Sequence, residues 1–195
     1  MPASTFDQIL AKGARQGILP ARTADARRWF RDQAKRSNVT AERLHAESKA
    51  AFTKSVSVGR MYMFFYDPKH KKTLPYYDRF PLIFPFKGES DGFYGINLHY
   101  LPPKLRAMLM DGLYDLLSNK KYDETTKLRL SYNVLNGASK YKWFKPCVKR
   151  YLSRHVRSRF IEVNVNEWDM ALMLPTQKFQ GASTAKVWRD SRNAV

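Results

Sequence analysis

Gly59-Arg-Met-Tyr-Met-Phe-Phe-Tyr-Asp67 is the first of four runs that define the expected architecture, followed by Thr73-Leu-Pro-Tyr-Tyr-Asp-Arg-Phe-Pro81, Leu82-Ile-Phe-Pro-Phe86 and Gly92-Phe-Tyr-Gly-Ile-Asn-Leu-His-Tyr100. Aromatic and branched runs separated by Gly, Pro and Asp are typical of short strands in a small, curved sheet. Pro102-Pro103 then opens a helical pattern with one apolar face, formed by Leu105, Met108, Leu109, Leu113, Leu116 and Leu117. We therefore predict a small barrel-like β core closed by a helix.

Further helices and one more strand surround this core in the expected α+β fold. Thr23 is the predicted N-cap of a helix over residues 24–35, and residues 159–166 alternate as a strand with one wet face. The barrel is expected to comprise about residues 56–100 plus the strand near 159–166, wrapped by N-terminal and C-terminal helices. We divide the chain into an N-terminal helical arm (1–50), a barrel core with packed helices (51–175) and a basic C-terminal tail (176–195).

The composition indicates a folded, strongly basic protein. Its 195 residues can bury one good core, and a hydrophobic content of 44% excludes a chain that is disordered throughout. We find no secretory signal and no apolar run long enough for a membrane span, and the lone Cys147, interpreted as a core residue, fits a reducing compartment. The formal net charge of +18 favours nucleic acid as the partner, with an acidic protein neighbour as the alternative.

The charge is concentrated in a segment without acidic residues. From Thr125 to Ile161 the chain carries Lys127, Arg129, Lys140, Lys142, Lys145, Lys149, Arg150, Arg154, Arg157 and Arg159. We expect Pro146 to lie early in a helix with an apolar stripe of Val148, Tyr151, Leu152 and Val156. Its opposite face would then present Lys145, Lys149, Arg150, Arg154 and Arg157. That geometry suits a helix lying along a phosphate backbone, whereas a merely solvated face would normally interleave acids.

A second candidate surface is the turn Asp67-Pro-Lys-His-Lys-Lys-Thr73, whose Lys69, Lys71 and Lys72 are either solvated or bound to an anion. The aromatic residues that follow, up to Pro81, are either a platform for bases or buried loop residues, and burial is the commoner explanation. Arg28 and Arg31 on the predicted helix 24–35 are secondary candidates for phosphate binding.

Catalytic signatures were sought and not found. The chain has no Gly-rich phosphate loop, no Gly-x-Ser-x-Gly elbow and no zinc-ligand spacing among its four histidines. A metal-free ribonuclease could use His99 or His70 beside Arg79, although such residues near a turn are ordinary. We therefore assign no catalytic residue, no metal ligand and no cofactor, and we expect no small-molecule ligand.

The pattern of Gly59–Asp67 followed by Arg79-Phe-Pro-Leu-Ile-Phe-Pro resembles the SH3-like barrel of the MazF/PemK type. The resemblance covers about residues 58–100. In that family the barrel is an endoribonuclease, and the resemblance would place the Arg79 loop at an RNA site. The family's further catalytic Thr or Ser cannot be matched in this sequence.

A more distinctive resemblance spans roughly residues 55–175. Tyr66-Asp-Pro-Lys, Thr73–Leu82 and Gly92-Phe-Tyr-Gly-Ile-Asn-Leu-His-Tyr-Leu-Pro-Pro103 are similar to small basic proteins of T4-like tailed phages, the group of DNA end protectors and head-completion proteins. The resemblance implies binding to packaged double-stranded DNA, or a place at the portal, neck or tail. It transfers no catalytic residue.

Together these observations predict a phage virion protein, present in the host cytoplasm during assembly, that binds double-stranded DNA non-specifically through phosphates. Its function would be to protect DNA ends or to complete the head alongside other virion proteins. The expected contacts are Lys69, Lys71, Lys72, Arg79, Lys145, Lys149, Arg150, Arg154 and Arg157, with Arg28 and Arg31 secondary. The alternatives are a structural tail, baseplate or neck component without DNA binding and, less favoured, a MazF-like ribonuclease.

Overall fold

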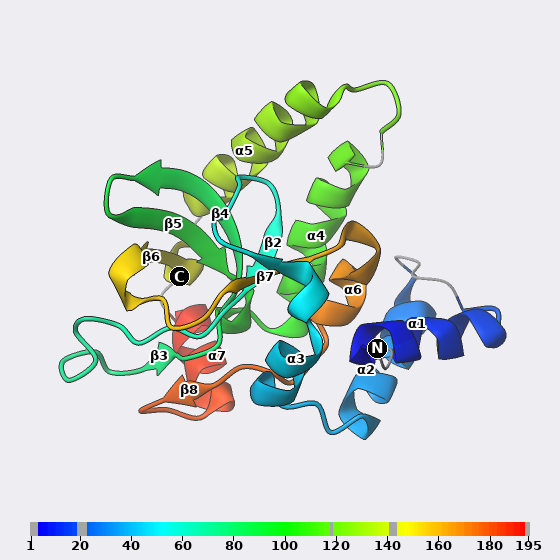
Figure 1. Ribbon diagram of the computed structural model, residues 1–195, viewed down its shortest axis with the longest axis horizontal. Coiled ribbons are helices and arrows are strands. Elements are labelled where there is room, and N and C mark those ends of the chain that lie inside the picture. The colour runs from blue at the N-terminus through cyan, green and yellow to red at the C-terminus, as the bar shows by residue number, and fades with distance from the viewer. Residues whose placement is uncertain (1–3, 19–22, 118, 141–143, 194–195) are drawn as a thin grey trace.

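The computed structural model describes residues 4–18, 23–117, 119–140 and 144–193, and it has the predicted α+β class (Figure 1). Helices surround one curved antiparallel sheet of six strands. A second, two-stranded sheet pairs β3 (Tyr77–Asp78) with β8 (Phe179–Gln180). Among the described residues, no helix combines the length and apolar character needed to cross a bilayer.

Three helices form the N-terminal part: α1 (Thr5–Arg15), α2 (Ala24–Arg36) and α3 (Ala41–Glu47), with a 3-10 turn at Lys49–Ala51. Thr23 caps α2 as predicted, since its hydroxyl accepts a hydrogen bond from the Ala26 N–H at 3.2 Å. Phe6, Phe30 and Leu44 from the three helices lie in the main apolar core together with side chains of the sheet.

The main sheet has the order β1-β7-β2-β4-β5-β6. Its strands are β1 (Phe52–Thr53), β2 (Met61–Met63), β4 (Leu82–Glu89), β5 (Gly92–Asn97), β6 (Val148–Leu152) and β7 (Phe160–Val163). The strands predicted at 82–86 and 92–100 are thus confirmed and pair as the antiparallel β4–β5 hairpin, and the strand expected near 159–166 is present over its first half. Gly92 is required where β5 meets β6, because a Cβ there would lie 1.9 Å from the Tyr151 carbonyl oxygen.

The coil after β6 bends back beside the end of β2, which gives the sheet a barrel-like curvature. Tyr66 forms an isolated antiparallel bridge with Val156, and the Arg157 N–H donates to the Phe65 carbonyl at 2.8 Å. The curve encloses a separate cluster of rings that includes Tyr62, Phe64 and Phe93, and burying each such ring stabilises the fold by roughly 1.5–3 kcal/mol. Because β1 and β6 remain the edges of the assigned sheet, the SH3-like closure stays a prediction.

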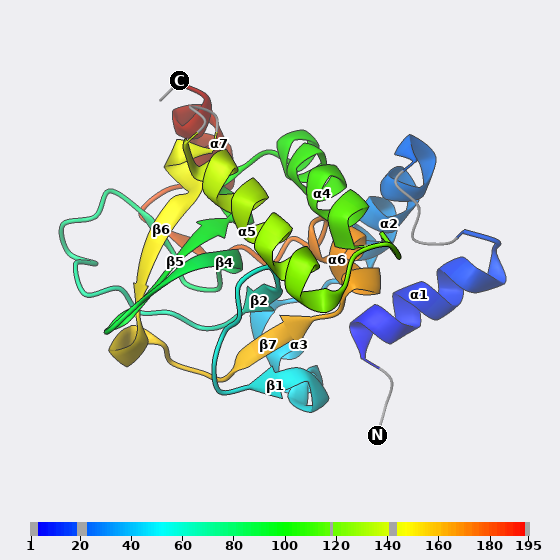
Figure 2. The same ribbon diagram turned by 90° about the horizontal axis from the view of Figure 1, so that it is seen from above.

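The remaining helices cover the sheet. Helices α4 (Pro103–Leu117) and α5 (Glu124–Lys140) pack against each other, and α5 contacts β4 and crosses the sheet in Figure 2. The short α6 (Trp168–Ala171) places Trp168 against Phe84, with ring centroids 5.0 Å apart. The C-terminal α7 (Thr184–Asn193) contributes Val187 to the main core. The division into arm, core and tail stays a prediction.

The prediction of a helix after Pro146 is wrong. Residues Lys145–Cys147 form a 3-10 turn, β6 follows, and Ser153–His155 form another 3-10 turn. In β6, Val148 pairs with Ile96 and Tyr151 pairs with Phe93, so the strand satisfies the backbone edge of β5. The apolar positions 148, 151 and 152 fit a helical stripe, but pairing with a strand distant in sequence overrides that local pattern.

Candidate nucleic-acid interface

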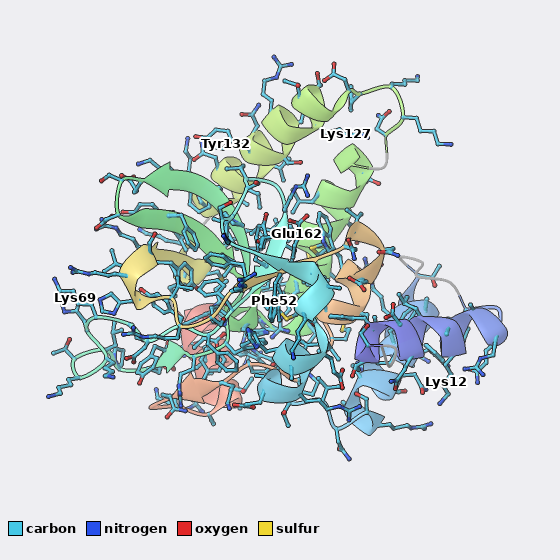
Figure 3. All side chains as sticks on the ribbon, viewed as in Figure 1. Lys12, Phe52, Lys69, Lys127, Tyr132 and Glu162 are labelled. Carbon is cyan, nitrogen blue, oxygen red and sulfur yellow. The ribbon has the colours of Figure 1, made fainter. Side chains whose placement is uncertain are left out.

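Three neighbouring segments carry six exposed cationic side chains, and three of these, Lys71, Arg79 and Arg157, act on the carboxylate of Asp67. We call this surface the Asp67 cluster; its cations are Lys69, Lys71, Lys72, Arg79, Arg154 and Arg157, all exposed. The lysines lie on the turn between β2 and β3, which is held by donation from the Thr73 and Leu74 N–H groups to the His70 carbonyl, both at 3.0 Å. Figure 3 shows Lys69 at the outer edge of this loop, away from the body of the protein.

Backbone hydrogen bonds fix the turn to its neighbours. The Asp67 N–H donates to the His155 carbonyl at 3.0 Å, and His155 Nδ1 donates to the Asp67 carbonyl at 2.8 Å. The Tyr66 N–H donates to the Arg79 carbonyl at 3.0 Å. These bonds place the turn beside the coil at residues 153–159 and the Arg79 backbone, although the segments are far apart in sequence.

Asp67 neutralises only part of this charge. Lys71 Nζ lies 2.9 Å from its carboxylate and Arg157 Nη2 lies 3.8 Å away. The hydrogen bond from Lys71, with the charges of Lys71, Arg157 and Arg79, lowers the pKa of Asp67 below its ordinary value. Within residues 65–73, 79 and 153–159 Asp67 is the one acidic residue, and the charge of Arg79 also acts on Glu42 of α3. The six cations outnumber these two carboxylates, so the cluster carries a surplus of positive charge that suits an anion.

The other predicted contact residues lie apart from the cluster. On β6, Lys149 is half-buried with its ammonium 4.1 Å from the Tyr100 ring centroid, and burial lowers its pKa. Arg150 pairs with Asp91 at 2.8 Å, and Lys145 is exposed on the preceding turn. The single cationic ridge expected over 145–157 is therefore not formed, because a strand sends alternate side chains to opposite faces.

The two secondary candidates occupy a different side of the molecule. Arg28 lies 3.7 Å from the Asp25 carboxylate and Arg31 lies 3.8 Å from that of Asp32, both on α2. Figure 1 places α2 on the opposite side of the protein from the loop before β3. Arg28 and Arg31 therefore lie apart from the Asp67 cluster, and their contact with DNA stays a prediction.

The aromatic residues after the turn are mostly internal. Tyr76 packs against Tyr100 with ring centroids 6.1 Å apart, and Phe80 is fully buried. Among the large hydrophobic residues of this loop Leu74 is exposed, at 41%, whereas Tyr76 and Tyr77 are half-buried. Burial, the commoner explanation, therefore accounts for these rings better than a base-stacking platform does.

A second polar centre lies inside the protein, and the sequence did not reveal it. Asp78 Oδ1 accepts hydrogen bonds from the Phe80 and Lys178 N–H groups at 3.0 Å, and Oδ2 lies 2.7 Å from His99 Nδ1. Burial raises the pKa of Asp78, but the charge and hydrogen bond of His99 and the two amides outweigh it and leave that pKa below its ordinary value. Burial lowers the pKa of His99 below its ordinary value, although the neighbouring Asp78 carboxylate acts in the opposite direction.

The same interior holds Arg106, which donates to the carbonyls of Leu101 at 2.7 Å and Leu172 at 2.8 Å. Burial lowers the pKa of Arg106 to about 10 and raises that of the Cys147 thiol to about 12. His99 is fully buried, so it cannot reach an RNA phosphate beside Arg79 in this structure. The geometry therefore gives no support to His99 as the general acid or base of a ribonuclease, whereas His70 is exposed on the turn. No group of three His, Cys, Asp or Glu that could hold a metal occurs in the part of the chain described.

Comparison with known proteins gives one match. The family model described as "Phage T4 terminal DNA protecting protein" matches residues 6–191, nearly the whole chain. No curated protein and no solved structure shows significant similarity to this protein.

Proposed function

Because the chain belongs to the family of the phage T4 terminal DNA protecting protein, we propose that it binds the ends of phage double-stranded DNA through phosphates at the Asp67 cluster. Six exposed cations on three segments that backbone hydrogen bonds hold side by side are the observation that carries this proposal. Such a surface releases counterions from DNA when it neutralises phosphates, and this release drives binding.

Binding through this cluster does not depend on the base sequence of the DNA. The cations project from a turn and a coil, and none of them lies on a helix that could enter the major groove. Contacts to phosphates position a protein on DNA without reading its bases. Preference for a terminus must therefore come from another feature of the protein.

The protein would act in the virion, after meeting the DNA in the host cytoplasm during assembly. Other virion proteins are its expected neighbours, and closing the filled head is a compatible role. A second candidate is a neck, tail or baseplate component without DNA binding. The observation that favours it is Met108, which is 59% exposed on α4 and offers an apolar contact to a protein neighbour. Absence of duplex binding at about 150 mM salt would support this second role.

A salt titration of duplex affinity tests the DNA-binding proposal. For the wild-type protein, the logarithm of the association constant plotted against the logarithm of the salt concentration should have a slope of about −0.9 for each phosphate contacted. Changing Lys69 and Lys72 to Gln together should make that slope shallower by about 1.8, since each lysine is expected to contact one phosphate. Fluorescence anisotropy with a labelled duplex at a series of salt concentrations provides the measurement.

The matched control changes Lys120 and Lys121 to Gln, which removes the same charge from another exposed turn. Figure 1 shows this turn, between α4 and α5, at the far end of the helical pair from the β3 loop. The control should leave the slope nearly unchanged. Equal losses from the two double variants would mean that net charge alone governs binding, and a flat wild-type response would remove DNA binding altogether.

A further inference from the structure

A hollow of about 540 Å³ lies between the end of the β4–β5 hairpin, the residues after β1 and the coil before β7. We call it the Gly88 pocket. Gly88 and Gly92 border it on the hairpin, and Lys54 and Arg159 border it on the other two segments. A volume in this range accommodates a small organic ligand of the size of a nucleotide.

The lining has the chemistry of an anion site. Lys54 and Arg159 are exposed, and neither forms an ion pair with a carboxylate of the described chain. The hydroxyl groups of Ser55 and Ser153 also line the pocket, whereas those of Thr53 and Ser158 donate to the Ser55 and Arg159 carbonyls, and none of the described lining residues is acidic. The two carboxylates of the adjoining hairpin are both engaged, Asp91 by Arg150 at 2.8 Å and Glu89 by Lys87 at 2.7 Å.

Two aromatic rings give the pocket an apolar side. Phe93 and Phe160 line it and are 6% and 8% exposed, while the rest of each ring packs into the enclosed aromatic cluster. Their ring centroids lie 6.0 Å apart. The small exposed parts of these two rings form an apolar wall that a nucleobase can contact irrespective of its identity.

The Gly88 pocket adjoins the Asp67 cluster across a single coil. Ser153, Val156 and Ser158 of this coil line the pocket, whereas His155 and Arg157 contact Asp67. Figure 1 shows the coil from β6 to β7 running beside the loop before β3. A duplex whose phosphates lie on the cluster can therefore bring its terminus to the pocket.

We propose that the Gly88 pocket binds the terminal nucleotide of the DNA, with its 5′-phosphate between Lys54 and Arg159 and its base against Phe93 and Phe160. This inference rests on the proposed function. Phosphate contacts are the same along a duplex, so a preference for ends requires a site for something found only there. A terminal phosphate carries more charge than a backbone phosphate, and a terminal base pair opens at the lowest cost.

Filling the pocket tests the inference. Gly88 pairs with Phe93 across the β4–β5 hairpin, so a side chain at 88 points to the same face as Phe93. A Cβ at Gly88 meets no atom within 4 Å, and the same is true at Gly137 on α5. Gly88→Leu therefore occupies the hollow, and Gly137→Leu is its matched control outside the pocket. Thermal unfolding by circular dichroism verifies that both variants fold.

The first measurement compares an open, 5′-phosphorylated blunt duplex with the same sequence closed at both ends by hairpin loops. The wild-type protein and Gly137→Leu should bind the open duplex about tenfold more tightly, a difference of the size of one good contact site. Two variants should bring the ratio of the affinities for the open and the closed duplex close to one. They are Gly88→Leu and the double variant Lys54→Gln/Arg159→Gln. A wild-type end preference that survives in these variants would overturn the pocket assignment and leave the proposed function standing.

The second measurement does not depend on duplex binding. Deoxyadenosine 5′-monophosphate, titrated into the full-length protein, should cause saturable NMR shifts of the Gly88, Gly92 and Ser158 amides, while deoxyadenosine without phosphate should cause much smaller ones. Gly88→Leu should abolish the shifts at Gly92 and Ser158, and Gly137→Leu should retain them. Absence of shifts at these amides in the wild-type protein would refute the pocket, whatever the duplex experiments show.

Discussion

Asp67 and Asp78 are both surrounded by cationic or hydrogen-bond-donating groups, but one lies on the surface and the other inside the protein. Asp67 is paired with Lys71 and Arg157 in solvent, and its cluster keeps a surplus of positive charge. Asp78 is fully enclosed and accepts hydrogen bonds from two backbone amides and from His99. The comparison teaches that burial, and not the number of nearby donors, separates charges that hold the fold from charges that are available to a ligand.

The largest effect is expected from removing the buried carboxylate. Asp78→Ala leaves the amides of Phe80 and Lys178 and the ring of His99 without an acceptor, and it should lower the free energy of unfolding by about 3–5 kcal/mol. Urea denaturation measures this loss. Asp67→Ala, the exposed counterpart, should shift the denaturation midpoint very little. Similar midpoint shifts for the two variants would contradict the distinction.

An intermediate effect is expected from pH, because burial lowers the pKa of His99 in the folded protein. The unfolded chain then binds the proton more readily, so His99 contributes stability above about pH 6.5 that is lost as the pH falls. Through this group the free energy of unfolding should change by at most about 1.4 kcal/mol per pH unit. Asp78, whose folded pKa is also lowered, adds a loss of the same sign only below its unfolded value of 3.8.

Denaturation midpoints of the wild-type protein and of His99→Asn between about pH 7.5 and pH 5 measure this contribution. Asparagine keeps a donor toward Asp78 but does not titrate, so its slope should be shallower. Burial also lowers the pKa of His45, which accounts for the slope that remains. Identical slopes would show that His99 is not a buried neutral group.

The smallest effect is expected from Asp67→Asn, which removes the carboxylate from the Asp67 cluster. Duplex affinity should rise about twofold at low salt, since one repulsive charge near the phosphates is lost and solvent screens it strongly. Anisotropy at low and high salt measures the change, which should disappear as salt increases. A loss of affinity would mean that Asp67 orients Lys71 and Arg157 for binding.

Elements with strong local signals could be predicted from the sequence. Thr23 and the residues after it form the expected capped helix, and the runs at 82–86 and 92–100 form the expected hairpin and its continuation. The strand β6 could not be predicted, because its partner edge on β5 lies about fifty residues earlier and its apolar positions also match a helical period.

The candidate site was only partly accessible to sequence reasoning for the same reason. The lysines at 69–72 stand out in a polar turn, but their approach to Arg157 depends on long-range pairing of the coil after β6 with the end of β2. Lys54 has no distinguishing local pattern, and only the fold brings it to Arg159. The buried Asp78–His99 pair likewise joins residues whose neighbours gave no signal of a polar interior.

The central claim is that the Asp67 cluster holds the phosphates of the duplex next to its terminus, and exonuclease digestion of linear duplex DNA tests it most directly. The account predicts that the wild-type protein and the Lys120→Gln/Lys121→Gln control protect the DNA, and that Lys69→Gln/Lys72→Gln protects it much less while remaining folded. Full protection by the Lys69→Gln/Lys72→Gln variant would contradict the account, because DNA ends would then be held by another part of the protein.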